Sequence, residues 1–181
     1  MNSRRVKGPN LTLRLVDADD AEYIHRLRTN PAYNEHLSEI TGTTNDQRRW
    51  IEAYKAREAL GVELYYLIER HDGRPCGTVR LYDIVDDQFT WGSWILDENK
   101  PAKAALESAI LSFGVGFGLL GKSRAVVEVR LGNTHAEAFY RRFGMTETGS
   151  DDHHRVFEYL NVQFKRDRHV YDEILDMDSQ R

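Results

Sequence analysis

The sequence predicts one domain of the mixed α/β (α+β) class, with helices flanking a single sheet. Segments with the two-residue alternation of strands and segments with helical periodicity follow one another in the order β-α-α-β-β-β-α-β-α-β-β. The length of 181 residues suits one domain, and no internal repeat, low-complexity tract or Ser/Pro/Gly-rich linker divides the chain. We therefore expect a single domain over residues 11–175, with tails at 1–10 and 176–181.

The first half of the chain is expected to contain a strand, two helices and three further strands. Leucines at positions 11, 13 and 15 alternate with polar residues, as in a half-buried strand. Capping residues and glycine or proline breaks indicate the other boundaries. The expected elements are a strand at 11–15, a helix begun by Asp17 or Asp19 and ended before Pro31, a helix from Thr43 or Thr44 to Gly61, and strands at 64–70, 78–85 and 89–96.

The second half is expected to alternate helices and strands. The helix after Asn133 has the clearest pattern, because its apolar residues recur at i, i+3, i+4 and i+7 from Ala136 to Phe143. The expected elements are a helix with Pro101 in its first turn, a buried strand at 125–129, the Asn133 helix, a hairpin with strands at 145–149 and 155–160, and a helix at 163–175.

Composition and charge exclude several classes of function. The formal charge of −4 argues against broad nucleic-acid binding, which relies on a basic surface. The single cysteine, Cys76, excludes an intramolecular disulfide framework and a multi-cysteine zinc site, and it suits the reducing cytoplasm. The longest uncharged run, from Ser108 to Gly121, has 14 residues, too few to cross a bilayer. Residues 1–10 lack the apolar core of a secretory signal, so we expect a soluble cytoplasmic protein.

Part of this uncharged run matches two nucleotide-binding patterns but lacks their context. Residues 116–123 read G-F-G-L-L-G-K-S, which satisfies both G-x-x-x-x-G-K-[ST] and G-x-G-x-x-G. Both motifs need a strand before the glycines and a helix after them, because the phosphates rest on that helix's N-terminus. Here the helical pattern comes first, so a phosphate would face the negative end of a helix. We expect a helix end with Gly121 as its C-terminal glycine.

The stretch from Val129 to Met145 carries the residues most informative about function. It reads V-R-L-G-N-T-H-A-E-A-F-Y-R-R-F-G-M and resembles the N-x-x-A-x-x-F/L-Y-x-K/R-x-G-F signature of the GCN5-related N-acetyltransferases (GNAT). The matching residues are Asn133, Ala136, Phe139, Tyr140, Arg142 and Gly144, with Met145 in place of the phenylalanine. Residues 91–96 and the helix after Pro101 resemble the family's central strand and cofactor helix, and residues 11–37 resemble the opening of its RimJ/RimL-like branch.

The resemblance implies an acyl-CoA-dependent N-acyltransferase, using acetyl-CoA or another acyl-CoA, and a mostly antiparallel sheet with splayed central strands. In the family, backbone N–H groups freed by the splay bind pantetheine and the thioester oxygen, and here Trp94, Ile95 and Leu96 would line that strand. Asn133 would hydrogen-bond the pantetheine arm, and Tyr140 would protonate the departing sulfur. The alternatives are a helix N-cap for Asn133 and a buried core aromatic residue for Tyr140.

The loop expected to bind the pyrophosphate departs from the family pattern. The family has Q/R-x-x-G-x-G/A, whereas residues 99–104 read N-K-P-A-K-A. Alanine is tolerated where the backbone is helical, so a helix N-terminus would still hold an anion. The expected contacts are Lys100, Ala102, Lys103 and Ala104, with two solvated lysines as the alternative. Residues 100–111 also resemble the variant loop of acyltransferases that modify amino groups on nucleotide-linked sugars.

A general base is less clearly indicated than the other groups. Many family members have a glutamate near the start of the central strand, where this chain has Gln88, Phe89 and Thr90. His36 ranks first as a replacement, because its segment lies where the family's acceptor pocket forms. The further candidates are His25, Asp83 and Asp86.

Two other groups of residues are not expected to take part in chemistry. His153 and His154 lie beside two aspartates, but adjacent side chains point apart and no further ligand spacing follows, so we expect a solvated hairpin turn and no metal. Cys76 lies between Pro75 and Gly77, so we expect a turn residue without a partner to activate it.

The primary hypothesis is therefore an N-acyltransferase that acts on a small primary amine, with the amino group of a nucleotide-linked amino sugar as first choice. The alternatives are a protein N-terminal acetyltransferase of the ribosomal-protein type and a degenerate, non-catalytic CoA-binding module. No nucleic-acid or membrane partner is expected, and homodimer formation stays open.

Overall fold

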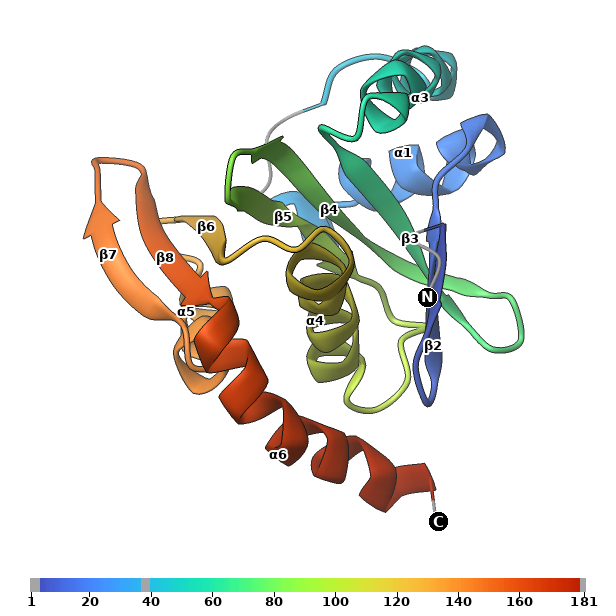
Figure 1. The fold of residues 1–181 in the computed structure, drawn as a ribbon. Helices are drawn as coiled ribbons and strands as arrows, with labels where there is room; N and C mark the ends of the chain where they lie inside the picture. Colours follow the sequence, from blue (N-terminus) through green and yellow to red (C-terminus); the bar gives the residue numbers. More distant parts are fainter. Residues whose placement is uncertain (1–3, 37–39, 180–181) are drawn as a thin grey trace.

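A single sheet runs through the whole computed structural model (Figure 1). The structure describes residues 4–36 and 40–179, and in this part of the chain eight strands stand in the order β1-β2-β3-β4-β5-β6-β8-β7. Every neighbouring pair is antiparallel except β5 and β6. The strands are β1 (Arg5–Lys7), β2 (Leu11–Leu15), β3 (Leu64–Arg70), β4 (Pro75–Val85), β5 (Gln88–Leu96), β6 (Arg124–Arg130), β7 (Thr146–Ser150) and β8 (His154–Leu160). The mixed, mostly antiparallel fold expected from the sequence is confirmed.

Helices cover both faces of this sheet. They are α1 (Ala21–Thr29), α2 (Pro31–Asn34), α3 (Thr44–Ala59), α4 (Ala104–Gly114), α5 (Thr134–Arg142) and α6 (Asn161–Ser179), with a 3₁₀ turn at Ala18–Asp20. α1 and α3 lie on one face, whereas α4 crosses the other with α6 beside it (Figure 1). Among the described residues, no helix combines the length and the apolar character needed to cross a membrane.

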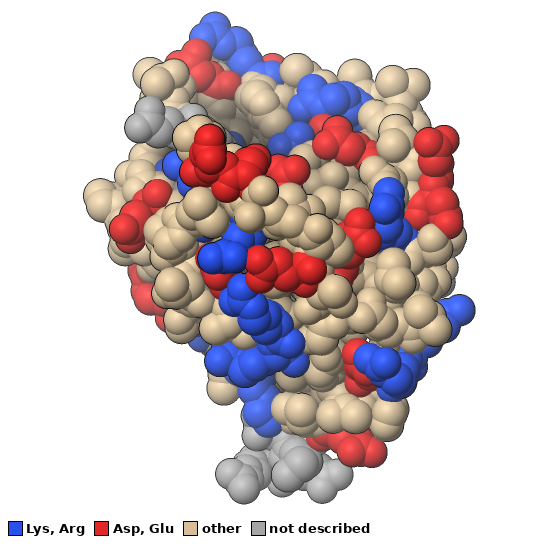
Figure 2. Space-filling view, turned by 90° about the vertical axis from the view of Figure 1, so that its left-hand side faces the viewer, with Lys and Arg blue, Asp and Glu red and all other residues tan. Residues whose placement is uncertain are grey.

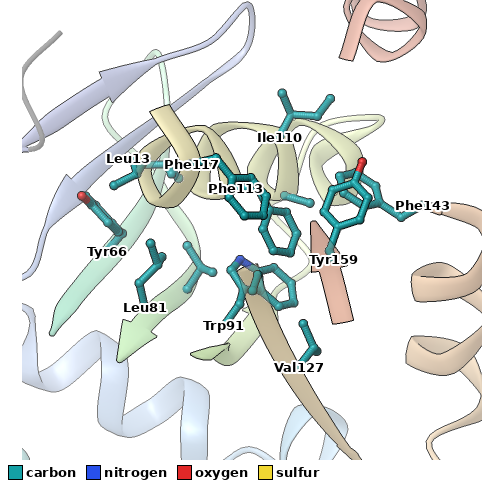
Figure 3. Packing of buried hydrophobic residues seen from close by; sticks show 14 of the residues in the cluster. Leu13, Tyr66, Leu81, Trp91, Ile110, Phe113, Phe117, Val127, Phe143 and Tyr159 are labelled. Carbon is teal, nitrogen blue, oxygen red and sulfur yellow. The ribbon is translucent and has the colours of Figure 1, made fainter. Parts of the chain in front are cut away.

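Side-chain alternation along β3 divides the core between these two faces. Tyr66 packs into the larger cluster beneath α4, whereas its neighbour Tyr65 packs with residues of α1 and α3. In the larger cluster Phe113 of α4 stacks on Trp91 of β5, with ring centroids 5.0 Å apart (Figure 3). α4 is therefore fixed against the central strand of the sheet.

Capping residues correctly placed several element boundaries. Thr43 caps α3 and Asn133 caps α5, each by accepting a hydrogen bond from the backbone N–H three residues later, at 3.3 and 3.2 Å. Gly61, with φ +70, follows the end of α3. β3 coincides with the strand expected at 64–70.

Both expected tails contain regular structure. Residues 5–7 form β1, an edge strand that pairs antiparallel with β2 and buries Val6. Three residues are too few for a recognisable alternation, so the sequence pattern did not reveal this strand. α6 continues to residue 179 and takes up most of the segment 176–181, while 1–3 and 180–181 lie outside the described residues.

The start of α4 also differs from the expectation. Pro101 precedes the helix, which begins at Ala104 instead. Lys103 has φ +58, a left-handed conformation that interrupts helical geometry between the proline and the helix. Because non-glycine residues seldom adopt this conformation, the interruption could not be predicted from the residue types.

A buried carboxylate ties α4 to the beginning of β2. Glu107 is fully buried, and its Oε1 accepts hydrogen bonds from the backbone N–H groups of Asn10 and Leu11, both at 2.8 Å. Its Oε2 accepts a third bond from Asn10 Nδ2 at 3.1 Å. A buried charge is tolerated only with such partners, so these bonds fix α4 relative to the first long strand.

Charged side chains also hold α5 against the last two strands. Arg141 of α5 and Arg155 of β8 both bind the carboxylate of Glu147 on β7, at 2.6 and 2.7 Å. Figure 2 shows the side of the molecule where these elements lie, with basic and acidic groups interspersed on it. The ion pairs there connect neighbouring elements.

The segment that matches nucleotide-binding motifs is a helix end packed on the sheet. α4 continues as a π-helical turn, Val115–Leu119, and Gly121 follows with φ +68, as expected for a C-terminal glycine. A Cβ on Gly116 would lie 2.2 Å from the ring of Phe89 on β5. Close packing against Phe89 therefore explains the first glycine of the motif.

Replacing Gly116 by alanine should lower the free energy of unfolding by about 1–3 kcal/mol, because the new methyl group must displace a buried aromatic ring. Gly118 offers a matched control, since a Cβ there meets nothing within 4 Å and alanine is the better helix former. Urea unfolding of the two variants measures the difference, and equal stability would contradict this account.

Candidate functional site

The central strands β5 and β6 run together for only three residues. Their parallel pairing joins Gln88–Thr90 to Arg124–Val126. Beyond Thr90, β5 stays paired with β4 as far as Leu96, and β6 stays paired with β8 as far as Arg130. The two strands therefore part, as the splayed sheet expected from the sequence requires, and the sheet opens at its centre.

A bulge in β5 places two tryptophans on the same face of the sheet. The register with β4 shifts just after Thr78, and Ser93 opposite has φ +46, while its carbonyl accepts a hydrogen bond from Thr78 Oγ1 at 3.1 Å. Residues three apart in a regular strand face opposite sides, but the extra residue turns both Trp91 and Trp94 toward α4. Their indole N–H groups donate to serines of that helix, at 2.8 and 3.1 Å.

The parting leaves backbone N–H groups of β5 facing the gap. The N–H of Asp97 donates to the carbonyl of Cys76 on β4, at 2.9 Å. Because successive N–H groups of a strand point to opposite edges, those of Leu96 and Trp94 point away from β4 and toward β6. Donors in this position suit a carbonyl or amide oxygen that enters the gap.

A cavity of about 230 Å³ lies at this parting. The residues expected from the sequence that line it are Trp94, Ile95, Asn133, Tyr140 and His36. Those expected from the sequence that lie outside its lining are Leu96, Lys100, Ala102, Lys103 and Ala104. The lining residues that the sequence did not single out are Arg28, Tyr82, Gly92, Ser93, Glu128, Val129 and Arg130. His154, which was expected in a solvated turn, lines the cavity as well.

The two faces of the sheet give this cavity two different sides. Tyr140 of α5 belongs to the cluster beneath α4 and packs against Trp91, with ring centroids 6.0 Å apart. Tyr82 of β4 and Glu128 of β6 follow directly on Leu81 and Val127, which point into that cluster. Alternation therefore places Tyr82 and Glu128 on the α1 and α3 side, so the parting joins a buried aromatic side to a polar side.

Tyr140 is almost completely buried, with 6% of its surface exposed. Burial raises the pKa of its hydroxyl well above the usual range, and the neighbouring Tyr82 adds to the shift. Tyr140 therefore keeps its proton at neutral pH, as a proton donor must.

Asn133 both caps α5 and lines the cavity. Its Oδ1 accepts a hydrogen bond from the N–H of Ala136 at 3.2 Å, so the capping role weighed from the sequence is real. Its position on the cavity wall makes the side-chain amide the group that would contact a ligand. The two roles are compatible because they use different atoms.

Glu128 is the carboxylate on the cavity wall that the sequence analysis missed. Burial raises the pKa of Tyr82, and the negative charge of Glu128 adds to that shift. The alternation of A-V-V-E-V-R put Glu128 on the face opposite the core. A charged residue on that face of a strand normally meets solvent, and Glu128 is exposed, but the parting of β5 and β6 also places it on the cavity wall.

The candidates for a general base proposed from the sequence lie in different places. His36 lines the cavity, with its Nε2 3.9 Å from Glu35 Oε2. His25 lines a neighbouring cavity. Asp83 and Asp86 lie at the β4–β5 hairpin end, both with positive φ, and neither lines the cavity at the parting of β5 and β6.

In the loop before α4, the two lysines expected to contact a pyrophosphate bind backbone carbonyls instead. Lys103 Nζ donates to the carbonyl of Ile174 on α6 at 2.7 Å, and Lys100 Nζ lies 3.4 Å from the carbonyl of Asp97. Arg70 and Arg74 reach Asn99 from the β3–β4 hairpin, each at 3.5 Å. α4 begins at Ala104, directly after this loop, and the backbone N–H groups at the start of a helix are of the kind that suits an anion.

The structure corrects the placement of Cys76 and His154. Cys76 lies in β4 and is fully buried, not in a turn, because the strand starts at Pro75. Burial raises the pKa of its thiol to about 12, which keeps it unreactive at neutral pH. His154 begins β8, half-buried on the cavity wall, rather than in a solvated turn. Within residues 4–36 and 40–179, no group of three or more metal-ligating side chains comes together.

The order of these elements and the parted central strands agree with one family of known proteins. The sequence profile of that family, described as an acetyltransferase (GNAT) domain, matches residues 10–146. The chain belongs to the GNAT family. No curated protein sequence matches the chain.

Solved GNAT structures resemble the chain over most of its length. FdhC, described as a nucleotide-linked sugar GNAT in its apo form, is 38% identical, with a TM-score of 0.87 over 94% of this chain and 98% of its own. A mutant of the spermidine N-acetyltransferase SpeG from Vibrio cholerae is 18% identical, with a TM-score of 0.72 over 90% of this chain and 97% of its own. A protein from the same organism assigned as a ribosomal-protein-serine acetyltransferase is 16% identical, with a TM-score of 0.70 over 86% and 97%.

A GNAT acetyltransferase domain implies an acyl-CoA co-substrate, and the residues at the parting fit one. The N–H groups of β5 that face the gap suit an extended, amide-containing arm such as pantetheine. The N-terminus of α4 suits its phosphates. The GNAT acetyltransferase is thus an enzyme whose cavity has an aromatic side toward α4 and α5 and a polar side toward α1 and α3.

Proposed function

We propose that this GNAT enzyme transfers the acyl group of an acyl-CoA, most simply acetyl-CoA, to the amino group of a nucleotide-linked amino sugar. The similarity to FdhC supports this acceptor, because it combines 38% identity with a TM-score of 0.87 over nearly the whole chain. The spermidine and ribosomal-protein enzymes, at 18% and 16% identity, support the fold alone.

Acyl-CoA supplies a thioester whose carbonyl carbon the acceptor amine attacks. The backbone N–H groups of Trp94 and Leu96 would hold the carbonyl oxygen and the pantetheine amides in the gap, and the side-chain amide of Asn133 would add a further contact. As the new C–N bond forms and the C–S bond breaks, Tyr140 would give its proton to the departing sulfur. The product is an amide, and the thiol form of CoA leaves.

The amine must also lose a proton, and three groups that can take it line the cavity: Glu128, His36 and His154. We assign this step to Glu128, because its carboxylate lines the cavity beside Tyr82. The pairing of β6 with β8 holds the strand that carries Glu128 in place. His36, the first choice from the sequence, lines the same cavity and stays the alternative. A carboxylate here also attracts the ammonium form of the acceptor from solution.

Two other functions remain as alternatives, and a transfer assay separates them from the proposal. Acyl acceptance by a peptide N-terminus or by spermidine would replace the nucleotide-linked amino sugar as the acceptor class. Binding of acyl-CoA without transfer to any amine would indicate a degenerate CoA-binding module, which the alanines in the pyrophosphate loop make conceivable.

The acceptor class is tested by thiol release from acetyl-CoA with three amines: a nucleotide-linked amino sugar, spermidine and a peptide with a free N-terminus. We expect turnover that is fastest, by kcat/KM, with the nucleotide-linked sugar. Thermal stabilisation by acetyl-CoA but not by ATP with magnesium is expected in the same samples, because the glycine-rich segment is a helix end. Faster turnover with either other amine would refute the proposed acceptor.

Tyr140→Phe should lower kcat by roughly 100-fold or more while leaving the Kd of acetyl-CoA nearly unchanged, because only the proton on the hydroxyl is lost. The raised pKa of Tyr140 means that its deprotonation should not cause a loss of activity in the wild type below about pH 10. Steady-state kinetics and calorimetric titration give both quantities. An unchanged kcat would remove Tyr140 from the mechanism.

Glu128→Gln should lower kcat/KM, since the amide cannot accept a proton. His36→Gln and His154→Gln are the matched comparisons, because both histidines also line the cavity. If kcat/KM falls in one of the histidine variants and is unchanged in Glu128→Gln, then that histidine is the base.

A further inference from the structure

A second cavity, of about 420 Å³, lies beside the catalytic cavity. Its walls come from α1, the segment before α3, α3 itself and β4, and Arg28 lines both cavities. The two spaces therefore adjoin at Arg28. The catalytic cavity alone, at about 230 Å³, is smaller than the roughly 300–1,000 Å³ of sites that enclose a whole ligand, so a large acceptor needs the second space as well.

Arginine side chains give this second cavity an excess of positive charge. Arg80 on its wall donates from Nε to Glu63 at 2.6 Å, and Arg57 donates to the other oxygen of the same carboxylate at 2.5 Å. One buried carboxylate is thus shared by two guanidinium groups. Arg28 adds a third cation, and burial together with the charge of Arg80 lowers its pKa.

The other titratable groups on the wall are His25 and Asp46. His25 Nε2 lies 3.1 Å from the carbonyl of Gly42. The Asp46 carboxylate accepts a hydrogen bond from the N–H of Thr43 at 2.7 Å and also binds Arg49. Among the described residues of this wall, Asp46 is the one acidic group and it is bound at the start of its own helix, so the described wall carries more positive than negative charge.

Arg80 is held in a fixed orientation before any ligand arrives. Its guanidinium lies over the rings of Tyr82 and Trp50, 4.6 and 5.4 Å from their centroids. Together with the bond to Glu63, these rings fix the planar group. A cation fixed in this way binds an anion with little further loss of side-chain entropy. Trp50 and Ile40 add an apolar wall to the same cavity.

We propose that the second cavity binds the nucleoside diphosphate part of the acceptor, with Arg28 and Arg80 as the anchors of the diphosphate. This rests on the proposed function, and it places the amino sugar in the catalytic cavity just past Arg28. Guanidinium groups match phosphate oxygens in pairs of parallel hydrogen bonds, and the apolar wall would lie against the nucleoside. A polyamine, being cationic, would be repelled by the same two arginines.

The test measures binding of uridine and thymidine diphosphates to the full chain by calorimetry, with the matching monophosphates and nucleosides as comparisons. No acyl donor and no amine are present, so the result does not depend on turnover. We expect the diphosphates to bind more tightly than the monophosphates, and the nucleosides to bind weakest. The affinity of the diphosphates should fall as salt is raised.

Arg28→Gln and Arg80→Gln should each weaken diphosphate binding by about tenfold or more, since each removes a charge-assisted, paired contact. Arg28→Lys keeps the positive charge but lacks the paired N–H donors of a guanidinium, so it should lose less affinity for the diphosphate than Arg28→Gln. It replaces the glutamine variant if that variant does not fold. Arg26→Gln is the matched control on the exposed side of α1 and should bind as the wild type does. Thermal midpoints and acetyl-CoA binding confirm that each variant is folded.

The outcomes separate this proposal from the proposed function. Failure of the wild type to bind any diphosphate, or unchanged affinity in both glutamine variants, overturns the subsite even if the enzyme acylates a nucleotide-linked sugar. Diphosphate binding that depends on Arg28 and Arg80 supports the subsite even if acyl transfer is found only with another amine, in which case the acceptor class alone is wrong.

Discussion

The parting of β5 and β6 after Thr90 is the constraint on which the functional architecture depends. Every other neighbouring pair in the described sheet is antiparallel and joined along its ladder, whereas this parallel pair ends after three residues. The bulge at Ser93 turns Trp91 and Trp94 into the cluster beneath α4. The cavity at this opening therefore has aromatic packing on one face of the sheet and polar side chains on the other.

Charged groups lie around this opening in a distribution that the formal net charge of −4 does not reveal. On the α4 side, the positive end of a helix dipole is available to an anion, although the nearby lysines are bound to backbone carbonyls. On the α1 and α3 side, Arg28 and Arg80 place positive charge on the second cavity, and Glu128 is the carboxylate among the described residues that line the first one. A chain with an acidic balance can therefore present cationic surfaces to both of its proposed substrates.

The sequence predicted those parts of the molecule whose signal is local. Period-two alternation identified β3, and the capping side chains of Thr43 and Asn133 identified two helix starts. Tyr140 and Asn133 were found because one contiguous segment carries their pattern. Glu128, Tyr82 and Arg28 were missed because their place on a cavity wall depends on the tertiary structure, namely on which strands part and which helix lies opposite. In sequence they are indistinguishable from the solvated residues of an alternating strand or an amphipathic helix.

The start of α4 is held by both ends of the chain: Glu107 binds the backbone at Asn10 and Leu11, and Lys103 binds Ile174 of the last helix. A ligand that settles at this helix terminus would then be coupled energetically to the order of segments that lie far from the gap. Occupancy by acyl-CoA would slow proteolytic clipping at both chain ends at once.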